Sequence, residues 1–404
     1  MRILEINKFH NANRGADKHF LDVSELLVKS GHEIAKFCMA QKGDVPTAWE
    51  TYFISPVGYT DAFTLWQKIK GVGRMFYSPE AHRNIKKILD DFKPDIVHIH
   101  NIYHQIDPTI LLAIKKRNIP IVMTVHDFKI INPNHAMMLN GEPYHRCKNG
   151  AYYQCLLDRC VKNSYGKSFI AMLEAYWHRM LGTYGNVDIF IAPSVFVKDR
   201  LNQWGIPQNK VQVIPHFVAQ SQLSKQEKGG SVSNSGSSYA LYAGKISKEK
   251  GVDRLINIFS GQSELKLYLA GEIEEGFMIP RDERINYLGM LPPSGIKKYM
   301  REAKFVISAT RLPETFGLIA LEALAAGVGF VGFNTGAFSE IISDKRCGTL
   351  VETEEDLRSE VHKIANGKMV FNRSAIHKLS KEFNERSYLE KIESLFGELI
   401  EKYQ

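Results

Sequence analysis

Ser308–Gly327, with the sequence SATRLPETFGLIALEALAAG, is the stretch that decides the fold of this 404-residue chain. The residues that lead into it, Lys304–Ser308, predict a buried strand, and Leu318–Ala326 predicts a helix of strong helix formers that ends at Gly327. A strand, a short glycine-containing loop and a helix N-terminus together form a place where backbone N–H groups and the helix dipole bind an anion. We therefore expect an α/β protein with a ligand site at this loop.

Two glutamates, Glu314 and Glu322, lie eight positions apart in this stretch. A continuous helix would place them about 80° apart around its axis, so they converge on one ligand only if Glu314 precedes the helix. Glu322 lies among leucines and alanines, so we expect a buried carboxylate that accepts hydrogen bonds. The alternative is a solvated Glu314 and a Glu322 that is capped by a neighbouring arginine or by backbone.

The length exceeds that of a typical single core, so we expect two domains. With 44% hydrophobic and 24% charged residues, the composition is typical of soluble globular proteins, and the apolar runs are too short to span a bilayer. The first strand begins almost at once, without a signal-peptide pattern, and five cysteines indicate a reducing compartment rather than a disulfide framework. These features predict a cytoplasmic protein.

A net charge of +8 predicts an acidic partner. Lys68, Lys70 and Arg74 are interleaved with aromatic and aliphatic residues between 63 and 77, and two further basic clusters lie at 83–87 and 115–117. This mixture favours an anionic membrane surface and a peripheral location on its inner face. A solvated helix face is an equal alternative. No nucleic-acid-binding motif is present.

Strand-like Val/Ile runs alternate with helical stretches throughout, which is the pattern of doubly wound α/β domains. Residues 221–238 are polar and rich in glycine and serine, which is typical of a linker. Neither half has a G-x-G-x-x-G fingerprint after its first strand, which argues against a dinucleotide enzyme. We therefore predict a first domain with an insertion, a linker or exposed loop, a second domain and a closing helix, at residues 1–216 (insertion 133–168), 217–238, 239–384 and 385–404.

Three more loops follow strand ends, where open α/β sheets bind ligands. Gly15 lies between the first strand and the first helix, and it lets backbone approach a phosphate. The second loop, 243–251, contains Gly244, Lys245 and Lys250, whose ammonium groups could bind a diphosphate. In the third loop, His126 and Asp127 follow the strand-like run Ile121–Val125. This pair could hydrogen-bond a polar substrate or act as an acid or base, although one histidine after a strand is more often structural.

The predicted insertion contains three of the five cysteines. Cys147, Cys155 and Cys160 could hold zinc together with His145, but the spacing lacks the close pairing of common zinc sites. Free thiols in a packed loop are the favoured interpretation.

The order and spacing of these motifs resemble the retaining, nucleotide-sugar-dependent glycosyltransferases of family 4, which have the GT-B fold. The resemblance extends over nearly the whole chain. It implies two Rossmann-like domains facing across a cleft, with a C-terminal helix that crosses back to the first domain. It is carried by Gly15, Val125-His126-Asp127, Ala192-Pro193-Ser194, Gly244-Lys245 with Lys250-Gly251, and Glu314-x7-Glu322 with Phe316-Gly317-Leu318.

The resemblance also implies roles for single residues. Glu322 would bind the ribose of the donor nucleotide, and Glu314 would hold the donor sugar together with the backbone of Phe316, Gly317 and Leu318. Lys245 and Lys250, helped by Gly15 and Gly244, would neutralise the leaving diphosphate. His126 would contact the donor sugar. No metal or cofactor is required in this scheme, and no enzyme nucleophile is assigned.

Together, these expectations predict an enzyme that transfers a sugar from a UDP- or GDP-sugar to a glycan or a polyprenyl-linked glycan, as in surface or capsular polysaccharide synthesis. Two alternatives remain open. A nucleotide-sugar epimerase with the same fold would turn over its donor without an acceptor. A non-catalytic protein would bind the nucleotide sugar and transfer nothing.

Overall fold

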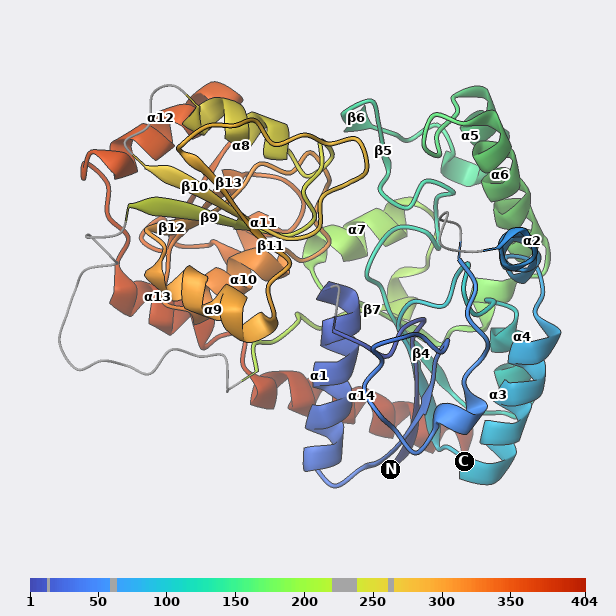
Figure 1. Cartoon of the computed structure of the whole chain (residues 1–404). Helices are drawn as coiled ribbons and strands as arrows, with labels where there is room; N and C mark the ends of the chain where they lie inside the picture. The colour runs from blue at the N-terminus through green and yellow to red at the C-terminus, as the bar shows by residue number, and fades with distance from the viewer. Residues whose placement is uncertain (13–14, 59–63, 220–237, 261–264) are drawn as a thin grey trace. The chain divides into compact units, whose positions relative to one another are not determined.

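The computed structural model describes residues 1–12, 15–58, 64–219, 238–260 and 265–404 (Figure 1). The chain divides into two compact units, one formed by Met1–Ile214 with Leu389–Gln404 and the other by Pro215–Tyr388. Each unit has its own parallel sheet and its own hydrophobic core. The expected doubly wound α/β class is therefore confirmed for both units.

The first unit is built on a parallel sheet, which has six strands in the described residues. Its order is β2-β1-β3-β4-β7-β8. The strands are β1 (Arg2–Ile6), β2 (Glu33–Phe37), β3 (Ile96–Ile99), β4 (Ile121–Thr124), β7 (Ile189–Ala192) and β8 (Val211–Val213). Every residue of β3 and β4 is buried, as expected for parallel strands that are covered on both faces.

The helices of the first unit connect and cover these strands. They are α1 (Gly15–Lys29), α2 (Leu65–Arg74), α3 (Pro79–Phe92), α4 (Ile110–Lys115), α5 (Tyr153–Leu157), α6 (Tyr165–Met180) and α7 (Val195–Gln203). Short 3-10 turns are η1 (Glu50–Tyr52), η2 (Lys148–Gly150), η3 (Thr183–Asn186) and η4 (Gln208–Lys210), and a small antiparallel pair is β5 (Met138–Leu139) with β6 (Glu142–Pro143). Side-chain caps begin several of these helices, such as Ser78 at α3 and Ser194 at α7.

The second unit repeats the arrangement, with six described strands in the order β11-β10-β9-β12-β13-β14. These are β9 (Tyr239–Ala243), β10 (Lys266–Ala270), β11 (Ile285–Gly289), β12 (Phe305–Ser308), β13 (Phe330–Phe333) and β14 (Gly348–Val351). Its helices are α8 (Val252–Phe259), α9 (Pro293–Glu302), α10 (Leu318–Ala325), α11 (Phe338–Ile341), α12 (Glu354–Ala365) and α13 (Arg373–Ser380). Figure 1 shows α9, α10 and α13 on one side of this sheet and α8 and α12 on the other.

The C-terminal helix α14 (Glu385–Tyr403) begins in the second unit, and its residues from Leu389 onward group with the first. Tyr403 Oη donates a hydrogen bond to Asp188 at 2.7 Å, and Asp188 also binds Lys115. Glu393 lies 2.7 Å from His32 Nε2. The expected return of this helix to the first domain is confirmed.

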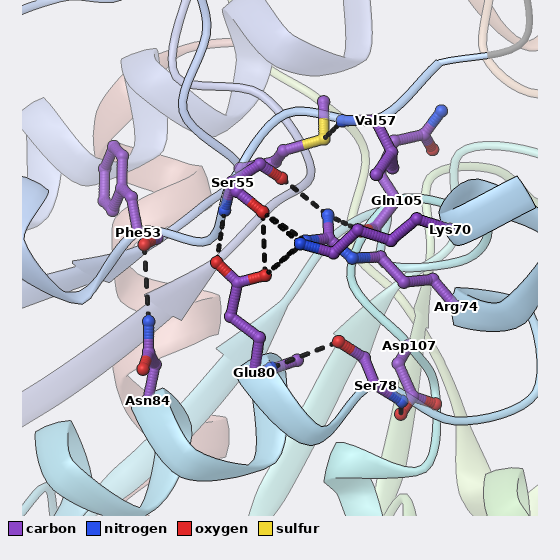
Figure 2. A network of polar contacts seen from close by, with 12 residues as sticks. Phe53, Ser55, Val57, Lys70, Arg74, Ser78, Glu80, Asn84, Gln105 and Asp107 are labelled. Atoms are coloured by element: carbon purple, nitrogen blue, oxygen red, sulfur yellow. Dashed lines mark hydrogen bonds and ion pairs between the residues drawn. The ribbon is translucent and has the colours of Figure 1, made fainter. Parts of the chain in front are cut away.

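A polar network fixes α2 onto the N-terminus of α3 (Figure 2). Arg74 is 2% exposed, and its guanidinium binds Glu80 at 2.6 Å and the backbone oxygen of Ser55 at 2.6 Å. Lys70 binds the same carboxylate at 3.0 Å. Burial would raise the pKa of Glu80, but hydrogen bonds from the backbone N–H and the hydroxyl of Ser55 and from Lys70, together with the charge of Arg74, lower it to about 2. The prediction that Lys70 and Arg74 serve an acidic partner is therefore wrong for Arg74, which holds the fold together.

The exposed face of α2 is apolar instead. Leu65, Trp66 and Ile69 are 73%, 80% and 52% exposed, while Phe63 of the same predicted cluster lies outside the described residues. Among the helices described, none combines the length and the apolar composition that crossing a bilayer requires.

Candidate active site

Two loops of the second unit lie side by side because β9 and β12, the strands that precede them, are neighbours in the sheet. The first loop runs from Gly244 to Gly251 and the second from Ala309 to Gly317. Arg311 N donates to the backbone oxygen of Glu249 at 3.0 Å. The loops that the sequence connects to one ligand are thus joined at the carboxyl edge of this sheet.

Lys250 and Glu314 form an ion pair across these loops. Lys250 Nζ lies 2.5 Å from Glu314 Oε1, and the two side chains are 33% and 22% exposed. Glu314 lies in the loop ahead of α10, which is the condition for both glutamates to reach one ligand. The pair is accessible enough for either group to exchange its partner for a ligand.

Glycines allow these loops to pack closely. A Cβ at Gly251 would lie 1.6 Å from the backbone oxygen of Ala309, and one at Gly317 would lie 2.6 Å from the ring of Phe338. Both glycines have positive φ values, 71° and 91°, and they occupy the N-caps of α8 and α10. A larger residue at position 251 would push the two loops apart, and one at position 317 would displace the second loop from α11.

Lys245 points to a different carboxylate, Glu274, at 2.5 Å. Its backbone oxygen accepts a hydrogen bond from Tyr242 Oη at 2.7 Å. Gly244 is contacted by Gly271, where a Cβ would lie 1.9 Å from the Gly244 oxygen. Both predicted lysines are therefore on this loop, each paired with a carboxylate of the same unit.

Glu322 differs from the expectation. It lies in α10 as predicted, but its side chain is only partly buried, so the inference of a buried carboxylate is wrong. Its neighbours Leu321 and Ala323 are buried, which leaves Glu322 on the outer stripe of the helix. Phe316 is buried, and its ring lies 4.9 Å from that of His216. Leu318, the first residue of α10, is partly buried.

The remaining two predicted residues are in the first unit. Gly15 is exposed and is the first residue of α1, but residues 13 and 14 of its loop lie outside the described residues. His126 follows β4 and is partly buried. Asp127, which the sequence pairs with His126, accepts a hydrogen bond from Lys129 N at 2.9 Å and so supports the turn.

His126 is attached to a buried network that the sequence motifs described above do not include. Its Nε2 lies 2.9 Å from His100 Nδ1, and the two rings are stacked. His100 Nε2 lies 3.3 Å from Glu5 Oε2, and His98 Nδ1 lies 2.9 Å from Glu5 Oε1. His98 Nε2 in turn lies 2.8 Å from Thr124 Oγ1. The half-exposed His126 is therefore the outer end of a hydrogen-bonded chain.

The network is electrostatically distinctive because Glu5, His98 and His100 are 0–2% exposed. Burial would raise the pKa of Glu5, but the charge of His98 and the hydrogen bonds from His100 and His98 lower it to about 2. Burial lowers the pKa of His100 to about 4, against the hydrogen bond to Glu5. The chain thus consists of a buried carboxylate and a largely uncharged His100.

Glu5, His98 and His100 also form a group whose ligand atoms lie within 4.8 Å of one another, as in metal sites. The hydrogen bonds among them already account for this spacing. A signal was present in the sequence, since Glu5 interrupts an otherwise apolar strand and His98 and His100 alternate with period two.

The cysteine-containing segment does not form the alternative zinc site. Cys155 and Cys160 are joined by a disulfide, while Cys147 is a buried free thiol. His145 packs beside Trp204, with 6.3 Å between ring centroids. The expectation of free thiols is wrong for two of the three cysteines, because the turn after α5 brings their Cα atoms to 4.9 Å.

Solved structures of known proteins share this architecture. A sucrose-phosphate synthase from Thermosynechococcus elongatus superposes with a TM-score of 0.73 at 13% identity, with 100% of both chains covered. The Anabaena protein HepE, in complex with UDP-glucose, superposes with a TM-score of 0.66 at 15% identity, covering 98% of this chain and 100% of that one. These similarities show that the chain has the two-domain GT-B fold.

Family models give the narrower assignment. The model of Glycosyltransferase Family 4 matches residues 13–222, and that of Glycosyl transferases group 1 matches residues 224–388. The chain belongs to glycosyltransferase family 4.

Curated relatives match this chain at low identity. An uncharacterized 42.6 kDa protein in the cps region of Klebsiella pneumoniae is 22% identical over 66% of this chain, and an alpha-monoglucosyldiacylglycerol synthase of Streptococcus pneumoniae is 28% identical over 45%. These matches span 64% and 45% of the relatives' own lengths. A phosphatidyl-myo-inositol mannosyltransferase of Mycobacterium tuberculosis is 21% identical over 84% of this chain and 79% of that protein.

Proposed function

We propose that this protein is a retaining glycosyltransferase that transfers a hexose from a UDP- or GDP-sugar to a glycan or lipid-linked glycan. The observation that carries the proposal is the Lys250–Glu314 pair, which joins the two glycine-shaped loops next to the N-terminus of α10. The family assignment and the relation in fold to a protein that binds UDP-glucose support a nucleotide-sugar donor.

The donor diphosphate binds to Lys250 and Lys245. Departure of the nucleoside diphosphate builds negative charge, and two ammonium groups together with a helix N-terminus stabilise that charge without a metal ion. Gly244 and Gly15 give the phosphates room to approach backbone. Lysine offers a compact charge rather than the bidentate contact of an arginine. The two lysines therefore attract the diphosphate by its charge and restrict its orientation less than arginines would.

The donor nucleoside and sugar bind to the carboxylates. Glu322, on the outer stripe of α10, accepts hydrogen bonds from the ribose hydroxyl groups. Glu314 and the backbone of Phe316, Gly317 and Leu318 hold the hydroxyl groups of the sugar. When the diphosphate binds, Lys250 exchanges the carboxylate of Glu314 for phosphate, and this exchange releases Glu314 for the sugar.

The acceptor binds in the first unit, in a cavity of about 450 Å³. This volume lies within the usual range of ligand pockets. The rings of Tyr152, Tyr184 and Trp204 line it and offer faces for a sugar to stack on. Tyr184 and Ile130 also line the small pocket that contains His126. The cavity is therefore adjacent to the residue that we assign to the reacting sugar.

Arg179 gives this cavity a cationic side. Its guanidinium lies over the ring of Tyr152, 5.9 Å from the centroid, and it occupies the space that a Cβ at Gly150 would need. A guanidinium favours a carboxylate or phosphate group on the acceptor. Relatives that glycosylate lipids, and one from a capsule gene region, are compatible with such an acceptor.

The protein works on an anionic membrane surface. Exposed apolar residues on α2 are accompanied on α6 by a stripe at helical spacing, formed by Phe169, Leu173, Trp177 and Met180. The two helices are linked, since Trp177 Nε1 donates to the backbone oxygen of Phe76 at 2.9 Å, two residues after α2. Apolar side chains of this kind enter the interface between headgroups and acyl chains. This surface supports a peripheral position on the inner face of the membrane, next to a lipid-linked acceptor.

The direct test is a transfer assay with UDP- and GDP-hexoses and lipid-linked glycan acceptors. We expect sugar transfer with retention of the anomeric configuration, and slow donor hydrolysis when the acceptor is omitted. Interconversion of two nucleotide sugars without an acceptor would identify an epimerase. Nucleotide binding without turnover of any donor would identify a non-catalytic binding protein.

A further inference from the structure

The side chains of the buried network share one face of the first sheet. Glu5 of β1 is the register partner of His98 on β3, and His98 is in turn opposite Val122 of β4. Residues two positions further along a strand return to the same face, which brings His100 and Thr124 onto it. The network is therefore produced by the strand register, and its members cannot separate without a shift of whole strands.

The hydrogen-bonding capacity of these groups determines where the protons are. An ionised carboxylate only accepts hydrogen bonds, so both His98 Nδ1 and His100 Nε2 must donate to Glu5. A neutral imidazole has one donor and one acceptor nitrogen. In the uncharged ring of His100, Nδ1 therefore accepts a hydrogen bond from the residue on its other side.

That neighbour is Nε2 of His126. Because His100 Nδ1 is an acceptor, His126 must donate its Nε2–H, and in the neutral ring the lone pair is then on Nδ1. The low pKa of His100 supports this direction, because a protonated His100 would reverse it.

We propose that Glu5 and His100 are positioning residues that fix His126 as the Nε2–H tautomer, so that its Nδ1 accepts a hydrogen bond from a hydroxyl group of the sugar substrate. The inference rests on the proposed function, in which His126 contacts the sugar. Neither Glu5 nor His100 touches the substrate in this scheme. Their contribution is to orient the ring of His126 and to hold its proton on the inner nitrogen.

This arrangement suits the reaction. The sugar gains positive charge as the nucleotide leaves, so a cationic imidazole at this position would oppose the transition state. A neutral His126 whose N–H points toward a buried carboxylate holds the substrate hydroxyl and adds no positive charge. The preorganised network means that the ring does not have to reorient when the sugar binds.

The tautomer can be measured directly. In the full-length protein labelled with 15N-histidine, a long-range 1H–15N correlation spectrum at pH 7.5 separates protonated from unprotonated ring nitrogens, and the spectrum of His126→Gln assigns the signals of His126. We expect a protonated Nε2 and an unprotonated Nδ1. A protonated Nδ1, or an equal mixture of tautomers, would overturn the proposal.

Two variants extend the test. Glu5→Gln replaces an acceptor by a group that can also donate, so we expect a mixture of His126 tautomers and a kcat lowered by about 10- to 100-fold, the range known for outer-shell partners of metal-ligating histidines. The donor KM should change much less. Asp107→Asn is the matched control, because Asp107 is also a fully buried carboxylate but binds Ser78 N and the Thr109 hydroxyl outside the network, and it should leave the tautomer and kcat unchanged. Equal effects of the two variants would mean that the role of Glu5 is only structural.

A bound metal is the competing explanation, and elemental analysis of the purified protein tests it. Stoichiometric zinc that is lost in Glu5→Gln would overturn the proposal, since the ring nitrogens would then be ligands. The experiments distinguish a failure of the proposed role of Glu5 and His100 from a failure of the proposed function. The expected tautomer without nucleotide binding would contradict the donor assignment alone, whereas nucleotide binding and transfer with the opposite tautomer would contradict the role of Glu5 and His100 alone.

Discussion

The two units hold the polar groups at their strand ends in opposite ways. In the second unit Lys250 and Glu314 are partly exposed and bind each other directly. In the first unit Glu5, His98 and His100 are buried, and only His126 at the end of their chain is half-exposed. Exposed pairs are weak and exchange partners readily, whereas buried ones are costly to break. The second unit is therefore suited to binding and releasing a charged ligand, and the first to holding one side chain still.

The largest effect should follow removal of a charge from the exchangeable pair. Lys250→Ala should lower kcat by about 10²- to 10³-fold, the usual cost of losing one group that stabilises a developing negative charge. Steady-state kinetics with saturating donor measure it. Lys248→Ala, on the same loop, is the matched control and should retain wild-type kcat. Equal losses in the two variants would mean that the loop needs only its overall charge.

Glu322→Ala should act on binding rather than on turnover. A hydrogen bond to a charged group contributes about 1.5–3 kcal/mol, so we expect nucleotide affinity to fall by roughly 10- to 100-fold. Calorimetric titration with UDP and GDP measures this loss, and Glu355→Ala, on the exposed face of α12, is the control. Wild-type affinity in the Glu322 variant would remove that residue from the donor site.

Arg179→Gln tests the acceptor cavity of the first unit. Losing one charge-assisted hydrogen bond should raise the KM for an anionic acceptor by about 10-fold or more, with the donor KM unchanged. Arg159→Gln is matched to it, because Arg159 also lies over a tyrosine ring, 5.1 Å from the centroid of Tyr165, but does not line the cavity. An acceptor KM that moves equally in both variants would contradict the assignment of this cavity.

The buried histidines predict how stability depends on pH. Burial lowers the pKa of His10, His100, His104 and His178, that of His100 to about 4. At these histidines the unfolded chain therefore binds more protons than the folded one below pH 6.5, and the free energy of unfolding should fall as pH falls. His100 contributes up to about 1.4 kcal/mol per pH unit between pH 6.5 and 4. Urea unfolding between pH 5 and 7.5 measures the slope, which His100→Asn should reduce. A slope of zero would contradict the neutral network.

The smallest expected effect concerns the membrane. Trp66→Glu should weaken sedimentation with vesicles that contain anionic lipids by several-fold, since one large apolar side chain contributes on the order of 1–2 kcal/mol to burial. Met278→Glu, an exposed apolar residue of the second unit, serves as the control. If the two variants bind vesicles equally well, α2 is not the membrane contact.

The donor loops of the second unit and the buried network of the first also differ in how well they could be predicted from the sequence. The donor loops are local, because Glu314, Gly317 and Glu322 lie within one strand–loop–helix segment, and the helix expected at Leu318–Ala326 is observed at Leu318–Ala325. The Glu5–His98 contact joins residues 93 positions apart, and it depends on a strand order that no local pattern encodes. For the same reason the burial of Arg74 was missed, since its partners Ser55 and Glu80 come from other segments. The prediction that Glu322 is buried was wrong because it relied on the apolar neighbours of this residue. Those neighbours show that the helix is apolar in composition, but they do not show which stripe of it faces the core.

The most direct test of the central claim is a thermal melt of the wild-type protein with UDP, GDP and ADP. A ligand that binds only the folded state raises the melting temperature by mass action. We expect either UDP or GDP to do so in the absence of metal, with the rise reduced in Glu322→Ala and kept in Glu355→Ala. If none of the three nucleotides shifts the melt, the loops at Lys250 and Glu314 are not a nucleotide-sugar site.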